Sequence, residues 1–266
     1  MKTSLLLVAV LSTASIALNA QDWAKARLEK SPRHLEWVKV KQGNREVNSF
    51  IAFPEVKEKA TAVVVIHEIF GLSDWVRGVA DQLAEAGYIA IAPDLLSGAA
   101  AGGGGTAELG AGDAVRKAIA GLPPEQITAD LNAVLEHVSK LPACNGSVAV
   151  GGFCWGGAQT FRFATNSRKV KAAFVFYGTG PDLPAELARI ESPVYGFYGS
   201  NDARVNATIP VSIDLMKRAG KTYDPVTYEG AGHGFMRAGE DPAGNEANKK
   251  AREEAWKRWR DLLKKI

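Results

Sequence analysis

A cysteine flanked by glycines is the residue of this chain best placed to act as a nucleophile. Cys154 stands at the centre of Gly152–Gly156, which reads Gly-Phe-Cys-Trp-Gly and lies between an apolar stretch and a helical one. This G-x-C-x-G pattern is typical of the nucleophile elbow, a sharp strand-to-helix turn that more often carries serine. The positive end of the helix would favour a thiolate and a developing oxyanion. The pattern predicts nucleophilic catalysis by Cys154, and a buried cysteine in a glycine-rich turn is the alternative.

An acid and a histidine follow the cysteine in the order that a triad on such a turn requires. Asp202 comes just after the apolar run 193–198, and His233 lies in a glycine-rich loop past Tyr228. Nucleophile, acid, histidine is the chain order of α/β-hydrolases. We therefore predict that His233 accepts the thiol proton and later passes it to the leaving group. Asp202 would hold the imidazole in the required tautomer.

The segment after the first buried strand supplies the next set of candidates. It reads His67-Glu68-Ile69-Phe70-Gly71-Leu72. In this fold one oxyanion-hole donor comes from this loop and the other from the residue after the nucleophile, so we predict the N–H groups of Ile69 and Trp155. An acid at Glu68 would sit close to the nucleophile, which is unusual for a plain esterase; a solvent-facing glutamate is the alternative. His67 is a candidate lining residue.

Hydrophobic periodicity predicts alternating strands and helices that would position these residues. A hairpin is expected over 37–41 and 46–53, turning at Gly43-Asn44. Further strands are expected at 62–66, 88–92, 147–151, 172–177, 193–198 and 224–228, and helices at 74–86, 113–120, 124–140, 156–165, 206–219 and 245–265. A flexible loop is expected over 97–112, which is rich in glycine and alanine. The alternation predicts an α/β fold, with a mainly parallel sheet, helices on both faces and ligands at the carboxyl edge of the strands.

Composition and the N-terminus limit the remaining function classes. With 266 residues and 46% hydrophobic content, the chain suits one domain, expected over residues 21–266. Residues 1–20 have the layout of a signal peptide cleaved after Ala17 or Ala20, which predicts a periplasmic or secreted protein without membrane insertion. The net charge of +3 comes largely from a basic final helix, and no nucleic-acid motif accompanies it. No metal-ligand spacing occurs, and a strand separates Cys144 from Cys154 too widely for a disulfide.

Taken together, these segments resemble the dienelactone hydrolase (carboxymethylenebutenolidase) family of α/β-hydrolases. The resemblance runs from about Trp37 to the C-terminus, and its motifs are 68–71 (Glu-Ile-Phe-Gly), 92–95 (Ala-Pro-Asp-Leu), 152–157 (Gly-Phe-Cys-Trp-Gly-Gly), Asp202 and 232–235 (Gly-His-Gly-Phe). It implies a triad of Cys154, Asp202 and His233.

The resemblance also implies roles for charged residues around the triad. Glu68 would be the partner of the resting thiol. When substrate arrives, the thiol would leave Glu68 and pair with the histidine. Two arginines would bind a substrate carboxylate. Arg237 matches one of them, whereas this chain has Gly98 where the other would stand.

The sequence thus predicts a hydrolase of small esters or lactones that acts through a thioester and needs no metal or cofactor. A broad-specificity carboxylesterase is one alternative. A non-catalytic binding or redox protein on the same fold is another, and the complete set of triad residues argues against it. The sequence predicts neither the physiological substrate nor the oligomeric state.

Overall fold

A computed structural model describes residues 22–110 and 112–266. The predicted signal peptide, residues 1–20, lies outside the described part of the chain. No helix within that part is long and apolar enough to cross a membrane.

The fold is built on an eight-stranded sheet in the order β1-β2-β4-β3-β5-β6-β7-β8. Its strands are β1 (Leu35–Gln42), β2 (Arg45–Ala52), β3 (Ala60–Ile66), β4 (Ile89–Pro93), β5 (Cys144–Phe153), β6 (Ala173–Phe176), β7 (Val194–Gly199) and β8 (Tyr223–Tyr228). β2 runs antiparallel to both of its neighbours, and the strands from β4 to β8 pair in parallel. β3 is buried along its whole length because helices cover both of its faces.

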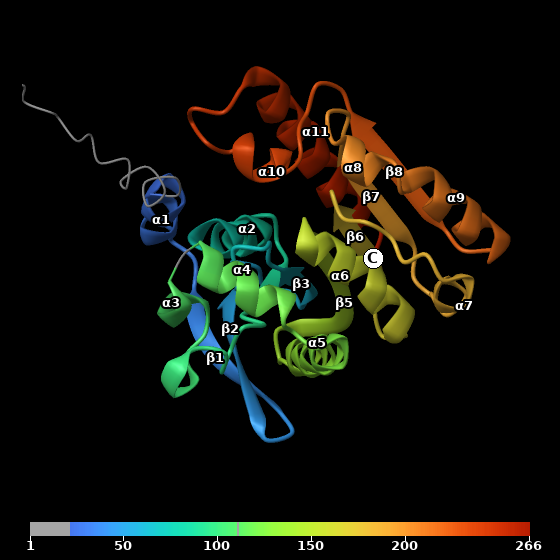
Figure 1. Ribbon diagram of the computed structural model, residues 1–266. Coiled ribbons are helices and arrows are strands. Elements are labelled where there is room, and N and C mark those ends of the chain that lie inside the picture. Colours follow the sequence, from blue (N-terminus) through green and yellow to red (C-terminus); the bar gives the residue numbers. More distant parts are fainter. Residues whose placement is uncertain (1–21, 111) are drawn as a thin grey trace, which may run out of the picture.

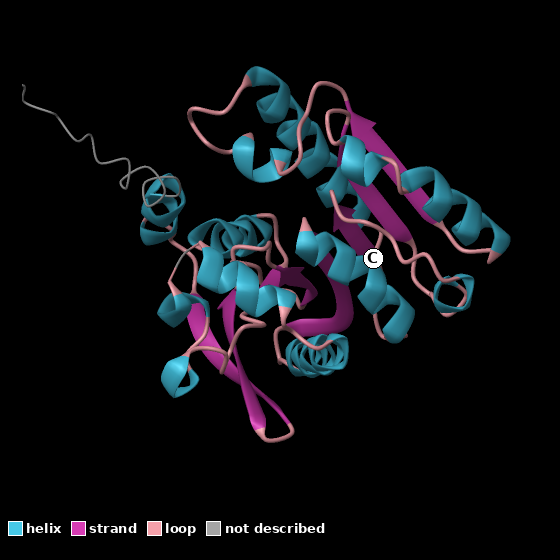
Figure 2. Cartoon of the chain, viewed as in Figure 1, coloured by secondary structure: helices cyan, strands magenta, loops and turns pink. Residues whose placement is uncertain are grey.

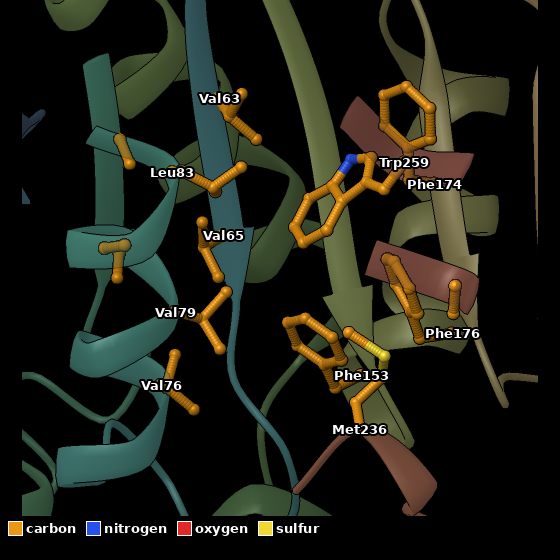
Figure 3. Close-up of a cluster of buried hydrophobic side chains, with 14 of the residues drawn as sticks. Val63, Val65, Val76, Val79, Leu83, Phe153, Phe174, Phe176, Met236 and Trp259 are labelled. Carbon is orange, nitrogen blue, oxygen red and sulfur yellow. The ribbon is translucent and has the colours of Figure 1, made fainter. Parts of the chain in front are cut away.

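Helices cover the sheet on both faces (Figures 1 and 2). They are α1 (Asp22–Glu29), α2 (Asp74–Glu85), α3 (Thr106–Leu109), α4 (Asp113–Ala120), α5 (Pro124–Ser139), α6 (Trp155–Asn166), α7 (Pro184–Leu187), α8 (Ala203–Asn206), α9 (Ile209–Arg218), α10 (Phe235–Ala238) and α11 (Glu246–Leu263), with a 3₁₀ turn η3 (Ala101–Gly103). One core cluster joins α2 and α11 to the sheet, and a second joins α5 and α6 to the opposite face. In Figure 3, α2 side chains face Val63 and Val65 of β3, while Trp259 of α11 lies beside Phe174 and Phe176.

The predicted fold class is confirmed, and most predicted elements lie within a few residues of the observed ones. The predicted loop over 97–112 is wrong in part, since η3 and α3 form inside it. The predicted helix at 206–219 corresponds to α9, which begins at Ile209, and the short α8 that ends at Asn206 was not predicted. Three other short or terminal helices were not predicted: α1, α7 and α10. These pieces are too short for a hydrophobic period to identify them.

Candidate active site

The turn at Cys154 has the strained geometry of a nucleophile elbow. Cys154 has φ 55° and ψ −115°, a left-handed conformation that residues other than glycine seldom adopt. Glycine is required on both sides. A Cβ at Gly152 would lie 2.3 Å from the carbonyl oxygen of Gly156, and a Cβ at Gly156 would lie 2.3 Å from that of His67. The turn places Cys154, half-buried, at the start of α6.

Three side chains predicted from separate strand ends meet at this turn. His233 Nε2 lies 3.1 Å from Cys154 Sγ, and His233 Nδ1 lies 2.5 Å from Asp202 Oδ2. Asp202 follows β7 and has a side chain only 7% exposed, whereas the His233 side chain is 35% exposed. The arrangement can relay a proton between the sulfur and the imidazole while the carboxylate fixes the ring.

The surroundings of His233 favour its charged form. A hydrogen bond to Cys154 is the main cause that raises the pKa of His233 to about 9, burial opposes it, and Asp202 adds to it. An imidazolium beside the sulfur in turn stabilises a thiolate. Cys154 and His233 therefore lie at a distance at which a thiolate and an imidazolium would form an ion pair.

Glu68 is buried and pairs with Arg237. Its side chain is 3% exposed, and its Oε2 accepts a hydrogen bond of 2.9 Å from Arg237 Nε. Burial raises the pKa of Glu68, and the charge of Arg237 opposes that rise. The alternative of a solvent-facing glutamate is therefore wrong. In this structure Glu68 pairs with arginine while the thiol pairs with His233.

Two aromatic residues that the sequence did not single out also contact this group. Tyr177 follows β6 with φ 41°, and its ring meets the His233 ring edge to face at 5.1 Å between centroids. Its buried hydroxyl has no hydrogen bond of regular geometry, yet it lies near enough to Glu68 to influence the pKa of that carboxyl. The Arg237 guanidinium lies 5.2 Å from the centre of the Phe70 ring. A tyrosine at the carboxyl end of a parallel strand was the available signal for Tyr177.

The two segments that carry the predicted oxyanion donors both contact a buried histidine, His67. Trp155 begins α6, and the first N–H of a helix has no intrahelical acceptor. Ile69 follows β3 in the turn that the bond from Gly71 N–H to the Glu68 carbonyl closes. His67 is fully buried, so the prediction that it lines the site is wrong.

The position that the resemblance gives to a second arginine has a backbone suited to glycine. Gly98 has φ +80°, and a Cβ there would lie 3.2 Å from Arg45 Nη1. Nearby, the Asp94 carboxylate accepts bonds of 2.7 Å from both the N–H and the hydroxyl of Thr106. The Thr106 hydroxyl in turn accepts from Leu72 N–H, so part of the expected flexible loop is tied to the turn beside Glu68.

No cluster of three metal-ligating side chains occurs among residues 22–110 and 112–266. Cys144 and Cys154 are both free thiols in the structure, near opposite ends of β5.

Comparisons with known proteins agree with this architecture. A model of the dienelactone hydrolase family matches residues 47–266. A "Putative carboxymethylenebutenolidase" of Methylorubrum extorquens is 30% identical over 209 residues, which span 74% of this chain and 71% of the relative. A relative of the same name from Salmonella typhimurium is 30% identical over 228 residues, 80% of each chain. A crystal structure named "Putative Dienelactone Hydrolase", from Klebsiella pneumoniae, shares the fold with a TM-score of 0.76 at 24% identity, covering 88% of this chain and 99% of that one. The family match spans most of the sequence, and the chain belongs to the dienelactone hydrolase family.

Proposed function

We propose that this protein hydrolyses small carboxylic esters or lactones, with Cys154 as the nucleophile and a thioester as the intermediate. The observation that carries the proposal is the chain of contacts from Cys154 Sγ to His233 Nε2 at 3.1 Å and from His233 Nδ1 to Asp202 Oδ2 at 2.5 Å. Membership of a family of hydrolases supports the same reaction class.

The first half-reaction forms the thioester. The Cys154 thiolate attacks the carbonyl carbon of the substrate, and the carbonyl oxygen becomes an oxyanion. The N–H groups of Ile69 and Trp155 stabilise that charge. As the intermediate collapses, the bond to the alkoxide breaks, and His233 gives the alkoxide its proton. In a lactone the leaving alcohol stays attached to the acyl group.

The second half-reaction releases the acid. His233, now neutral, accepts a proton from water as the water oxygen attacks the thioester carbonyl. The bond to sulfur then breaks, the carboxylic acid leaves and the proton on His233 again faces a thiolate. Asp202 stabilises the imidazolium in both halves of the reaction.

Charge near the nucleophile indicates which substrates would bind. Arg237 is 30% exposed and offers a planar fork of donors that suits a carboxylate. It already pairs with Glu68, and Gly98 provides no second arginine. We therefore propose a preference for neutral or weakly acidic substrates. A broad carboxylesterase remains the closest alternative, and a panel of lactones and neutral esters separates the two.

The nucleophile is tested by substitution and alkylation with p-nitrophenyl acetate as substrate. Wild type should release a burst of nitrophenol, Cys154→Ala should release none, and Cys154→Ser should retain little, because an alcohol needs a stronger base than a thiol. Cys144→Ala is the matched control, since Cys144 is the other cysteine and is buried away from the site. Full activity after complete alkylation of Cys154 by iodoacetamide would refute the assignment. A folded wild type without turnover would favour a binding protein.

We also propose export through the N-terminal segment. Protein recovered from the periplasm or the medium should begin at Leu18 or at Gln21, according to the cleavage position. N-terminal sequencing checks this, and an intact N-terminus on protein retained in the cytoplasm would contradict it.

A further inference from the structure

A fully buried histidine contacts both segments that carry the proposed oxyanion donors. His67 has no exposed surface, and burial lowers its pKa. Its Nε2 lies 3.3 Å from the N–H of Leu95, and its Nδ1 lies 2.9 Å from the carbonyl oxygen of Glu68. A backbone N–H can only donate, so Nε2 accepts and the ring proton is on Nδ1. That proton is donated to the Glu68 carbonyl.

The carbonyl that His67 holds belongs to the same peptide group as the N–H of Ile69. The chain has no cis peptide bond in its described residues, and in a planar trans peptide the C=O and the N–H point in opposite directions. Fixing the Glu68 carbonyl therefore fixes the direction of the Ile69 N–H. The N–H of Gly71 donates to the same carbonyl at 3.1 Å, which leaves the peptide little freedom to rotate.

The ring of His67 also contacts the residue that carries the other donor. It stacks on Trp155 with 5.4 Å between centroids and 17° between planes. The chain at His67 and the start of α6 are in close contact, as shown by the 2.3 Å that would separate a Cβ at Gly156 from the carbonyl oxygen of His67. One side chain thus touches both halves of the proposed oxyanion hole.

We propose that His67 is a positioning residue for the oxyanion hole: its Nδ1–H orients the Ile69 N–H through the Glu68 carbonyl. This rests on the proposed ester hydrolysis. His67 itself touches no substrate. Its contribution would be greatest in the transition state, where the oxyanion carries full charge.

Three substitutions separate the hydrogen bond from the ring. In His67→Asn the amide nitrogen takes the place of Nδ1 and can still donate to Glu68. In His67→Gln the side-chain amide reaches the place of Nε2, so it can accept from Leu95 but no longer donates to the Glu68 carbonyl, which keeps only its bond from the Gly71 N–H. His67→Phe retains the stack on Trp155 and loses both hydrogen bonds.

The expected readout is a split between kcat and KM on p-nitrophenyl acetate. Loss of one oxyanion donor costs about 10²–10³ in kcat, and a misdirected donor should cost less, about tenfold, in His67→Gln and His67→Phe. KM should stay near the wild-type value, because ground-state binding does not use this charge. His67→Asn should keep kcat within about threefold of wild type, the rescue that a donor at Nδ1 predicts. Circular dichroism confirms that each variant is folded at the assay temperature.

Two measurements without turnover distinguish this inference from the proposed function. The rate at which iodoacetamide alkylates Cys154 reports the pair with His233 and should be unchanged in all three variants. Butanal adds reversibly to the thiol, forming a carbon–sulfur bond and a hydroxyl at the former carbonyl oxygen, and its Kd should rise about tenfold in His67→Gln.

The outcomes are then separate for the two proposals. If wild type hydrolyses no ester, the proposed function fails, and butanal binding still tests His67. Unchanged kcat and butanal affinity in His67→Gln and His67→Phe would overturn the role of His67. So would a fall in alkylation rate equal to the fall in kcat, or a loss in His67→Asn as large as in His67→Phe.

Discussion

Main-chain geometry holds the candidate site around Cys154, whereas long-range side-chain contacts hold it around Arg237. At the ends of β3 and β5 the chain passes so close to itself that a single added carbon at Gly152 or Gly156 would meet backbone atoms at 2.3 Å. Nothing there can yield without a shift of a strand or of α6. This half of the site is positioned by sterics.

The half that carries His233 and Arg237 depends on a buried acid. Glu240 follows α10, and its side chain is 7% exposed. Its carboxylate accepts bonds of 3.0 Å from Arg27, 3.0 Å from Trp75 and 2.8 Å from Gln82, and Arg252 lies 3.3 Å away. These partners come from α1, α2 and α11, so one carboxylate joins three helices to the turn after α10.

Backbone hydrogen bonds connect Glu240 to the loop that carries His233. The N–H of Gly239 donates to Phe235, that of Glu240 to Arg237, and that of Arg237 to Gly234, beside His233. A segment held by sterics should tolerate no change and fail abruptly, whereas one held by several polar contacts should loosen by degrees. The predictions below test this difference, from the largest expected effect to the smallest.

Gly156→Ala should have the largest effect, because it adds a carbon to the part of the site around Cys154, where main-chain segments are in close contact. The new Cβ would lie 2.3 Å from the carbonyl oxygen of His67 and 2.5 Å from that of Ile66, and neither can move freely. We expect loss of esterase activity and a fall of roughly 3 kcal/mol in the free energy of unfolding, at the upper end of overpacking costs. Urea unfolding and initial rates measure both.

Gly78→Ala is the control for that substitution. Gly78 lies inside α2, and a Cβ there would have no atom within 4 Å. Alanine should raise the stability by about 0.5–1 kcal/mol, since it favours helix. Equal effects of the two substitutions would mean that close packing at the elbow does not hold the site.

The same difference decides how much could be predicted from the sequence. The fold class, the order of the motifs along the chain and the elbow can be predicted from local patterns. These patterns are the apolar runs, the glycines around Cys154, and an acid and a histidine past later strands. Because parallel strands end at one edge, these local signals suffice to bring Cys154, Asp202 and His233 together.

The support around Arg237 has no such local signal. Glu240 meets Arg27 at a separation of 213 residues and Trp75 at 165. Nothing in the order of residues says that these side chains share one buried carboxylate. The helix α3 inside the predicted loop 97–112 could not be predicted for the same reason. The contact of Thr106 with the buried Asp94 stabilises this segment, and no hydrophobic period marks it.

Glu240→Gln should loosen the second half by a smaller amount. Both carboxylate oxygens face donors, so the amide nitrogen of glutamine must oppose either Arg27 and Gln82 or Trp75 and Arg252. We expect a loss of roughly 2 kcal/mol in the free energy of unfolding. Activity should fall several-fold without being abolished, because α10 keeps its own backbone bonds.

Asp81→Asn is the matched control for Glu240→Gln. Asp81 is a buried acid of α2 that pairs with Arg33 at 2.7 Å and is not hydrogen-bonded to α10. It should lower the stability and leave kcat/KM of the folded protein unchanged. If both variants lose activity in step with stability, Glu240 supports the fold in general and not the site.

Arg237→Ala should have a smaller free-energy effect than Glu240→Gln, about 1.4 kcal/mol, and the effect should depend on substrate charge. A buried charge-assisted hydrogen bond contributes about 1.5–3 kcal/mol, and sharing Arg237 with Glu68 reduces what a substrate carboxylate can gain. On paired esters that differ only in a carboxylate, kcat/KM should fall about tenfold more for the acidic member. Arg237→Lys keeps the charge and should fall less. An equal fall on both esters would mean that Arg237 does not read substrate charge.

The smallest effect concerns the proton on His233, where the two halves of the site meet. NMR titration of the imidazole should give a midpoint near the pKa of about 9, above the ordinary value of 6.5, because the hydrogen bond to Cys154 favours the charged ring. In Cys154→Ala the main cause is gone, so the midpoint should move down, while Asp202 continues to favour the charged form.

The raised pKa of His233 also makes the stability depend on pH: the stability that it adds is complete below pH 6.5 and is lost as the pH rises through about 9. His67 serves as the internal comparison, since burial lowers its pKa and its ring should stay neutral throughout that range. A midpoint for His233 that is the same in wild type and in Cys154→Ala would show that the thiol does not hold the imidazole, and would remove the link between the elbow and the His233 loop.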